Sequence, residues 1–259
     1  MTAFKTRLAT SRSCVYSTIR HPTTGTRQLQ YTGPIKVKLF SKKNRASNGF
    51  PDGFDQTSGP IVILGFNKTG TTSLKHLFRD SGFREIKHDN GRLPLAIIRN
   101  AASRQKVFEG YEEHYSVFCD LGYFSQTFCF ECNQLFRTID HDYPNARFIY
   151  NHRPVDKWLD SRVNHRSASD RQHGTLLARS MAFHGVNDVE AMREIWRTQR
   201  SRLEQDLEDY FAASDKLLKF DIGDDDIPTQ ISRFLAFEIE PETWKHRRKT
   251  ADVTTEQPG

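Results

Sequence analysis

Short apolar runs alternate with amphipathic stretches from about residue 59 to the C-terminus. Runs rich in β-branched and aromatic residues predict buried strands at 60–66, 84–88, 115–120, 146–153 and 215–222. Apolar residues that recur every three or four positions predict helices at 72–81, 93–105, 130–144, about 189–210 and 227–237. Pro154 is expected in the first turn of a further helix. This alternation predicts an α/β domain with an open, mostly parallel sheet flanked by helices on both faces.

The first 58 residues depart from this pattern. They lack helical periodicity, and between Met1 and Pro51 they contain ten Lys or Arg residues but no Asp or Glu. The whole chain has 38 basic and 32 acidic residues, so the part after Pro51 keeps 28 basic residues and a net charge of −4. We therefore expect a basic arm at 1–58, partly disordered or a transit peptide, followed by one domain at 59–259. Because the positive charge belongs to the arm, no nucleic-acid partner is expected for the domain.

Composition limits the protein class and its compartment. The chain has 259 residues, of which 36% are hydrophobic, enough to bury a sizeable core. It contains no apolar run as long as the ~18 residues of a membrane span, and no secretory apolar segment at its start. Its four cysteines fit a reducing interior, so we expect a soluble intracellular protein, with organelle targeting by the arm as the alternative. Cys129 and Cys132 cannot complete a zinc site alone and are interpreted as small apolar residues on one helix face.

The segment IVILGFNKTGTTSLKHLF, at 61–78, has the layout of a phosphate-binding loop. An apolar strand leads into Gly65, Gly70 follows five residues later, and a helix begins. The lysine, Lys68, lies inside the loop rather than after the second glycine as in nucleoside triphosphatases. A magnesium-dependent enzyme would also need a carboxylate at a strand end, for which Asp221 is the candidate. A divergent P-loop kinase or triphosphatase is therefore the weaker alternative.

A second segment, FIYNHRPVDKWLDSRVNH, places an arginine at a strand end and a serine in the next helix. Arg153 follows the predicted strand, and Ser161 comes eight residues later. A guanidinium group can grip a phosphate through two parallel hydrogen bonds. Ser161 lies roughly 10 Å along the helix from Pro154, at ~1.5 Å per residue. It can present a hydroxyl to the same ligand.

Together these two segments resemble sulfotransferases that use 3′-phosphoadenosine-5′-phosphosulfate (PAPS). In that family a loop similar to GFNKTGTTSL holds the 5′-phosphosulfate, and an Arg and a Ser at this separation hold the 3′-phosphate. The resemblance, which covers residues 59–259, implies a P-loop-type sulfotransferase fold and metal-independent, in-line transfer of a sulfuryl group. The acceptor would be a hydroxyl or amine of a small molecule or carbohydrate. The loop sequence Gly-Phe-Asn-Lys is more similar to the loops of bacterial and carbohydrate-type sulfotransferases than to those of cytosolic phenol and steroid sulfotransferases.

The resemblance also assigns roles to individual residues. Lys68 would stabilise charge on the leaving group in catalysis. Contacts to PAPS would come from Asn67, Lys68, Thr69, Gly70, Thr71, Thr72, Ser73, Arg153 and Ser161. A basic segment near the C-terminus would close over the 3′-phosphate, with Arg248 and Lys249 as candidates. Thr250 stands there where the family has glycine.

Several residues are candidates for the base that takes the proton of the attacking hydroxyl. Carbohydrate sulfotransferases carry a glutamate about two dozen residues past the loop lysine, and here His88 follows Lys68 by twenty residues. His88 is the predicted base, since imidazole accepts protons near neutral pH. Asp89 and Asp120 are alternatives at strand ends, and His165 either caps a helix or lines the acceptor site. A protein that binds the nucleotide without chemistry is the remaining alternative.

Overall fold

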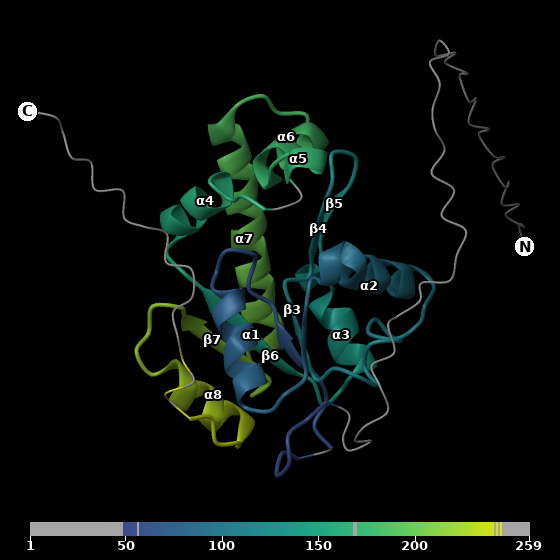
Figure 1. Cartoon of the computed structure of the whole chain (residues 1–259), viewed down its shortest axis with the longest axis vertical. Helices are drawn as coiled ribbons and strands as arrows, with labels where there is room; N and C mark the ends of the chain where they lie inside the picture. The colour runs from purple at the N-terminus through teal and green to yellow at the C-terminus, as the bar shows by residue number, and fades with distance from the viewer. Residues whose placement is uncertain (1–48, 56, 168–169, 241, 243, 245–259) are drawn as a thin grey trace, which may run out of the picture. The chain divides into compact units, whose positions relative to one another are not determined.

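The computed structural model describes residues 49–55, 57–167, 170–240, 242 and 244 (Figure 1). Most of the predicted basic arm lies outside these residues. So do Arg248 and Lys249, which keep their assignment as a prediction from the sequence alone. No helix in the described ranges is both long enough and apolar enough to cross a bilayer.

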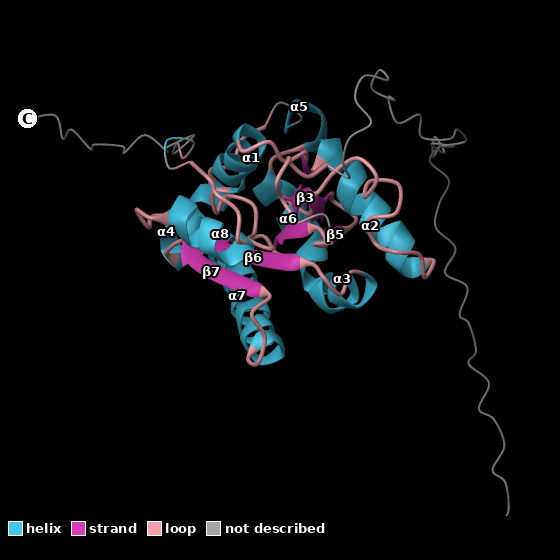
Figure 2. Cartoon of the chain, turned by 90° about the horizontal axis from the view of Figure 1, so that it is seen from below, coloured by secondary structure: helices cyan, strands magenta, loops and turns pink. Residues whose placement is uncertain are grey.

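The predicted parallel sheet is confirmed. Its five strands are β1 (Ile61–Ile63), β2 (Glu85–Lys87), β3 (Val117–Cys119), β6 (Arg147–His152) and β7 (Leu217–Asp221). They lie in the order β2-β3-β1-β6-β7, and every neighbouring pair is parallel. In Figure 2, β6 and β7 are the adjacent strand arrows at one edge of this sheet. The strand β1, which leads into the glycine-rich loop, therefore occupies the centre.

Helices cover both faces of the sheet, as the continuous apolar strands require. Alternate residues of β1 separate the two cores: Ile61 and Ile63 pack in one, and Val62 packs in the other. The first core is covered by α1 (Thr71–Asp80) and α8 (Ile227–Leu235). The second is covered by α2 (Arg92–Ala102), α3 (Phe136–Asp142), α4 (Val155–Val163) and α7 (Val189–Phe211). Figure 1 shows α4, α5 (Asp170–His173) and α6 (Leu176–His184) gathered at one end of the long helix α7.

The helix predicted over 130–144 is wrong in its first half. Residues Cys129–Glu131 form β5, which pairs antiparallel with β4 (Gly122–Phe124). A 3-10 turn, η2 (Cys132–Leu135), then leads into α3. The cause is tertiary, because Tyr123 and Phe130 stand opposite each other across the hairpin, and such aromatic pairs stabilise strands. Cys129 and Cys132 consequently lie on a strand and a 3-10 turn, not on one helix face.

The chain before residue 59 contributes to the core. Phe50 and Phe54 are buried, and their rings stack with centroids 5.0 Å apart. Both rings meet the edge of Phe83, which follows α1. This aromatic cluster lies on the α1 face of the sheet and packs in the same core as Ile61 and Ile63.

Candidate active site

Four residues that the sequence suggests for catalysis have a positive φ, and they lie at the carboxyl edge of the sheet. In an open α/β sheet, ligands bind outside this edge. Lys68 follows β1 with φ 73°, His88 and Asp89 follow β2 with φ 56° and 45°, and Asp120 follows β3 with φ 58°. Each such non-glycine residue costs roughly 1 kcal/mol or more, and strained residues of this kind cluster at functional sites. The positive φ values therefore occur at the same strand ends where the sequence predicts catalytic residues.

The loop after β1 is shaped to bind an anion. Helix α1 begins at Thr71, and Gly70 precedes it with φ 92°, a conformation that favours glycine. The helix has no side-chain hydrogen bond at its N-cap and no acidic residue in its first turn. The Ser73 amide donates to the Gly70 carbonyl at 2.9 Å, so the N–H groups of Thr71 and Thr72 are the ones left for a ligand. The helix dipole favours negative charge there. Thr71 and Ser73 are buried at this end, and Thr72 is half-buried.

The loop is held in place by a buried residue of the neighbouring strand. Asn151 of β6 donates from Nδ2 to the Thr69 carbonyl at 2.6 Å and to Thr69 Oγ1 at 2.9 Å. The Thr69 hydroxyl donates in turn to the Phe66 carbonyl at 2.6 Å. These bonds close the loop on itself and tie it to the sheet, so its shape does not depend on a ligand.

The closest approach between loop and strand occurs at Gly65. A Cβ added there would lie 2.2 Å from Asn151 Oδ1 and 2.4 Å from the Asn151 carbonyl oxygen. Contacts that short are not tolerated, and one contacting atom belongs to the backbone. Gly65 is needed for space rather than for a positive φ.

Substituting Gly65→Ala is therefore expected to lower the free energy of unfolding by about 1–3 kcal/mol, the usual cost of overpacking. Gly223→Ala is the control, because that site, like Gly65, has no positive φ and an added Cβ there would approach only the Asp221 side chain, at 3.2 Å. Urea unfolding of both variants measures the difference. Equal losses would show that the Asn151 contact is not the constraint.

The two segments that the sequence predicts to hold one nucleotide are in direct contact. Arg153 Nη1 lies 3.5 Å from the Lys68 carbonyl oxygen. Trp158 of α4 donates from Nε1 to the Asn67 carbonyl at 3.1 Å, and its ring packs on Phe66 with centroids 5.3 Å apart. Ser161 is half-buried on the same helix, one turn beyond Trp158. The loop and the Arg/Ser segment therefore border one site.

A lysine that the sequence analysis missed joins α1 to the neighbouring strand ends. Lys87, the last residue of β2, donates from Nζ to Thr72 Oγ1 at 2.6 Å. The same Nζ lies 3.5 Å from Asp120 Oδ2. The sequence predicts a strand at 84–88 that ends at His88, so it indicates this part of the ligand edge but does not select Lys87. Lys87 adds positive charge beside the loop and positions both Thr72 and Asp120.

The ring of His88 is oriented by its own turn. His88 Nδ1 accepts a hydrogen bond from the Gly91 amide at 3.2 Å. A neutral imidazole carries one proton, so this bond places the proton on Nε2. In this tautomer Nε2 carries the proton and has no free lone pair. It therefore cannot take a proton from the hydroxyl group of a substrate. Asp89, next to it, lies 3.6 Å from Arg92 Nε.

A second histidine, His165, lies in the electrostatic reach of the loop lysine. It is half-buried just after α4, and its pKa is lowered chiefly by burial and then by the positive charge of Lys68. His165 is therefore neutral at pH 7, with Asp120 and Asp170 among the carboxylates that act on it. The interpretation that His165 lines the acceptor site stays a prediction from the sequence.

A buried ion pair, Arg162 with Glu131, packs against Phe66 of the loop. Arg162 of α4 is 0% exposed, and its Nη2 donates to Glu131 Oε1 at 3.1 Å. The guanidinium carbon lies 4.5 Å from the Trp196 ring centroid, 5.2 Å from that of Trp158 and 5.9 Å from that of Phe66. Sequence reasoning did not find this pair, since nothing in the local pattern distinguishes Arg162 from a surface arginine.

Asp221, the carboxylate that a metal-dependent enzyme would use, has other partners. Its Oδ2 lies 3.5 Å from His152 Nδ1, and its Oδ1 accepts from the Gly223 amide at 2.8 Å. Within the described ranges, no three His, Cys, Asp or Glu side chains are grouped to hold a metal ion.

Comparison with known proteins agrees with this geometry. The sulfotransferase domain family matches residues 60–219, a span that contains the loop, Arg153 and Ser161. No curated protein matches the chain significantly. The matched span is more than half of the 259 residues, and the chain therefore belongs to the sulfotransferase domain family.

Proposed function

We propose that the protein transfers the sulfuryl group of PAPS to the hydroxyl group of an acceptor. The bond between sulfur and the bridging oxygen of the 5′-phosphosulfate breaks while a bond from sulfur to the acceptor oxygen forms. The acceptor's proton passes to a base, and adenosine 3′,5′-bisphosphate leaves. The contacts of Arg153 with Lys68 and of Trp158 with Asn67 carry this proposal, because they bring two anion-binding segments to one ligand.

The donor set suits the two phosphate-bearing ends of PAPS. The N–H groups of the first turn of α1, the hydroxyls near them and Lys68 can receive the 5′-phosphosulfate. Arg153 and Ser161 can receive the 3′-phosphate. In the transition state negative charge grows on the bridging oxygen, and Lys68 can stabilise it electrostatically. Lys87 increases the positive potential around this position through its place beside Thr72.

Nucleotide binding tests the proposal directly. Adenosine 3′,5′-bisphosphate is expected to raise the melting temperature without magnesium, since any ligand that binds only the folded state stabilises it. Arg153→Ala should weaken its binding by about 10–100-fold, the usual worth of a hydrogen bond to a charged group, and Ser161→Ala by less. Arg171→Ala, which changes an exposed arginine, is the control. Stabilisation by ATP that requires magnesium, with no response to the bisphosphate, would favour the kinase alternative.

For the base, we propose Asp120 in preference to His88, the base that the sequence predicts. A carboxylate offers lone pairs in every orientation, whereas His88 must break its bond with Gly91 to free one. Asp120 also follows β3, the strand adjacent to β1, while His88 follows the edge strand β2. Its positive φ is shared by Asn in many proteins, so Asp120→Asn preserves the backbone.

We expect Asp120→Asn to lower kcat by about 10²–10⁴-fold, the usual contribution of a general base, and His88→Gln to lower it by less than about 10-fold. Affinity for adenosine 3′,5′-bisphosphate should stay close to wild type in both variants. Steady-state kinetics between pH 5 and 9 check this. A loss of the acidic limb of the pH profile in His88→Gln, with Asp120→Asn active, would reverse the assignment.

A further inference from the structure

Lys87 lies between the start of α1, which is proposed to hold the donor, and the proposed base. Its Nζ donates to Thr72 Oγ1 at 2.6 Å, and the same atom lies 3.5 Å from Asp120 Oδ2. All three residues are half-buried and stand at the carboxyl edge of the sheet, where ligands of open α/β sheets bind. A ligand at this edge can therefore contact them.

The bond from Lys87 decides the direction of the Thr72 hydroxyl. An ammonium group has three hydrogens and no lone pair, so Thr72 Oγ1 is the acceptor and its own hydrogen points away from Lys87. A hydroxyl that accepts from a cation is polarised and becomes a stronger donor. The Thr72 amide is also one of the two N–H groups left for a ligand at the start of α1. An anion bound there can therefore receive both the amide and the hydroxyl of Thr72.

A second contact of the same kind joins α1 to β2 one step further from the edge. Lys75 Nζ of α1 lies 3.5 Å from Glu85 Oε1, on the first residue of β2. Residues three apart on a helix, or two apart on a strand, share a face, so both contacts belong to one α1–β2 interface. The Lys87 contact is the one at the carboxyl end of β2, and Lys87 also approaches Asp120. The Lys75 contact therefore provides a comparison in which a lysine joins the same two elements.

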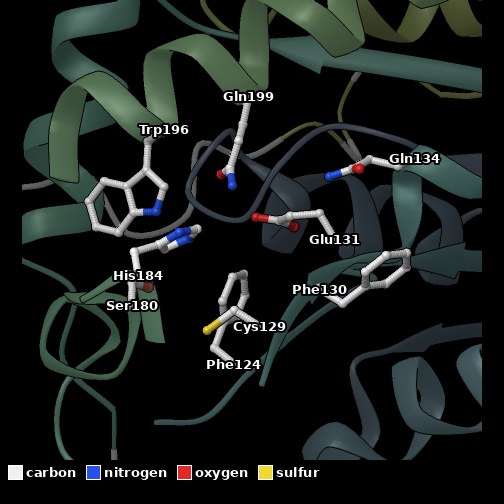
Figure 3. A pocket seen from close by; sticks show the side chains of 9 residues that line it. All are labelled: Phe124, Cys129, Phe130, Glu131, Gln134, Ser180, His184, Trp196 and Gln199. Carbon is white, nitrogen blue, oxygen red and sulfur yellow. The ribbon is translucent and has the colours of Figure 1, made fainter. Parts of the chain in front are cut away.

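The cavity shown in Figure 3 is lined by other residues. It lies between the β4–β5 hairpin and the helices α6 and α7, and its volume is about 190 Å³. Among the described residues, Lys87, Thr72 and Asp120 are not part of its lining. A base must come within hydrogen-bond reach of the hydroxyl that it deprotonates. We therefore expect the acceptor at the carboxyl edge of the sheet, not in this cavity.

We propose that Lys87 is a positioning residue for the transfer, and that it couples the donor site to the base. This inference rests on the proposed sulfuryl transfer and on Asp120 as its base. During the transfer the acceptor's proton passes to the Asp120 carboxylate. The electron pair of the breaking bond between sulfur and the bridging oxygen moves to the 5′-phosphate. Negative charge therefore leaves Asp120 and appears on the leaving group at the start of α1.

Lys87 contacts residues at both ends of this charge movement. Before the transfer, the Asp120 carboxylate at 3.5 Å partly balances the Lys87 charge. Once Asp120 holds the proton, this balance is lost, and the Lys87 charge acts on the phosphate beside Thr72. A charge that is already in place stabilises the transition state without reorganisation. Lys68 is proposed to act on the bridging oxygen directly, whereas Lys87 acts through Thr72 and Asp120.

The first test compares lysine variants at the two α1–β2 contacts. The rate is that of PAPS cleavage with water as the acceptor, followed by the release of inorganic sulfate. We expect Lys87→Met to lower kcat by about 10–100-fold, the usual worth of a hydrogen bond to a charged group. Lys87→Arg should restore kcat to within about 10-fold of wild type, because it keeps the positive charge. Lys75→Met should leave kcat close to wild type. An equal loss in Lys75→Met would assign the effect to packing of α1 on β2 and overturn the proposal.

The second test asks whether Lys87 acts through its two partners. Lys87→Met is combined with Thr72→Val and, separately, with Asp120→Asn. Residues that act through one another show losses that do not add, so Lys87→Met should cost less than about 3-fold in kcat in either background. The full loss, in either background, would show that Lys87 does not couple the two residues.

Binding of adenosine 3′,5′-bisphosphate, followed by thermal stability, separates this proposal from the proposed function. Lys87→Met should weaken this binding by less than about 10-fold, because its contribution is made mainly in the transition state. If the bisphosphate binds to wild type and Lys87→Met cleaves PAPS at the wild-type rate, the role of Lys87 fails and the donor assignment stands. If the bisphosphate does not bind to wild type, the sulfotransferase proposal itself fails.

Discussion

Replacing Lys68 with methionine is expected to lower kcat by about 10²–10³-fold. That is the usual effect of removing one group that stabilises transition-state charge, about 2.7–4 kcal/mol. Lys68 lies in the loop after β1 with φ 73°, a strained position that a functional role explains. Methionine is unbranched like lysine and only one atom shorter, so the variant removes the charge with little change in packing. The loss should appear in kcat rather than in nucleotide affinity, because the charge matters most once the bond to sulfur breaks.

Lys157→Met is the matched control for this variant. Lys157 is exposed on α4, the helix that contacts the loop through Trp158. The same loss of one lysine charge, at a position outside the loop, should leave kcat unchanged. Rapid-quench measurement of a single turnover would separate the chemical step from product release. A single-turnover rate in Lys68→Met equal to that of wild type would remove Lys68 from the catalytic role.

Glu131→Gln is expected to have the largest effect on stability, a loss of about 3–5 kcal/mol. Removing one member of a buried ion pair leaves the other charge buried and uncompensated. Arg162 would keep its charge at 0% exposure, and in wild type its Nε and Nη1 already find no partner within the described residues. Burial is also the main influence on the pair itself, because it raises the pKa of Glu131 and lowers the pKa of Arg162.

The double variant Glu131→Leu with Arg162→Met tests whether the lost stability is electrostatic. Apolar replacements of both members of a buried pair are often neutral or stabilising. The double variant should therefore recover most of the free energy of unfolding that Glu131→Gln loses, as measured by urea denaturation. If the double variant is as unstable as Glu131→Gln, packing rather than charge accounts for the loss.

The sequence predicted the sheet well because its strands are buried on both faces. A run such as residues 60–66 stays apolar whatever packs on it, so the strand can be recognised without knowledge of its neighbours. The β4–β5 hairpin was missed for the opposite reason. Cys129–Glu131 has no strong local preference for a strand and becomes one through pairing with Gly122–Phe124.

The candidate site divides in a similar way. The loop and the Arg153/Ser161 segment could be predicted, because each is a local arrangement of strand end, turn and helix. Lys87, Arg162 and Glu131 could not be assigned, since their roles arise from contacts between residues distant in sequence: Lys87 with Asp120, and Glu131 with Arg162. The preference for Asp120 over His88 required the hydrogen bond that fixes the imidazole ring, which no spacing in the sequence reveals.

The hydrogen bonds from Asn151 to Thr69 have a consequence for turnover. A binding loop that is already rigid without its ligand loses little conformational entropy when the ligand binds. The spent nucleotide differs from the donor only by the departed sulfuryl group, so it meets the same rigid loop and keeps most of the affinity. In the proposed transfer, we therefore expect the spent nucleotide to dissociate slowly.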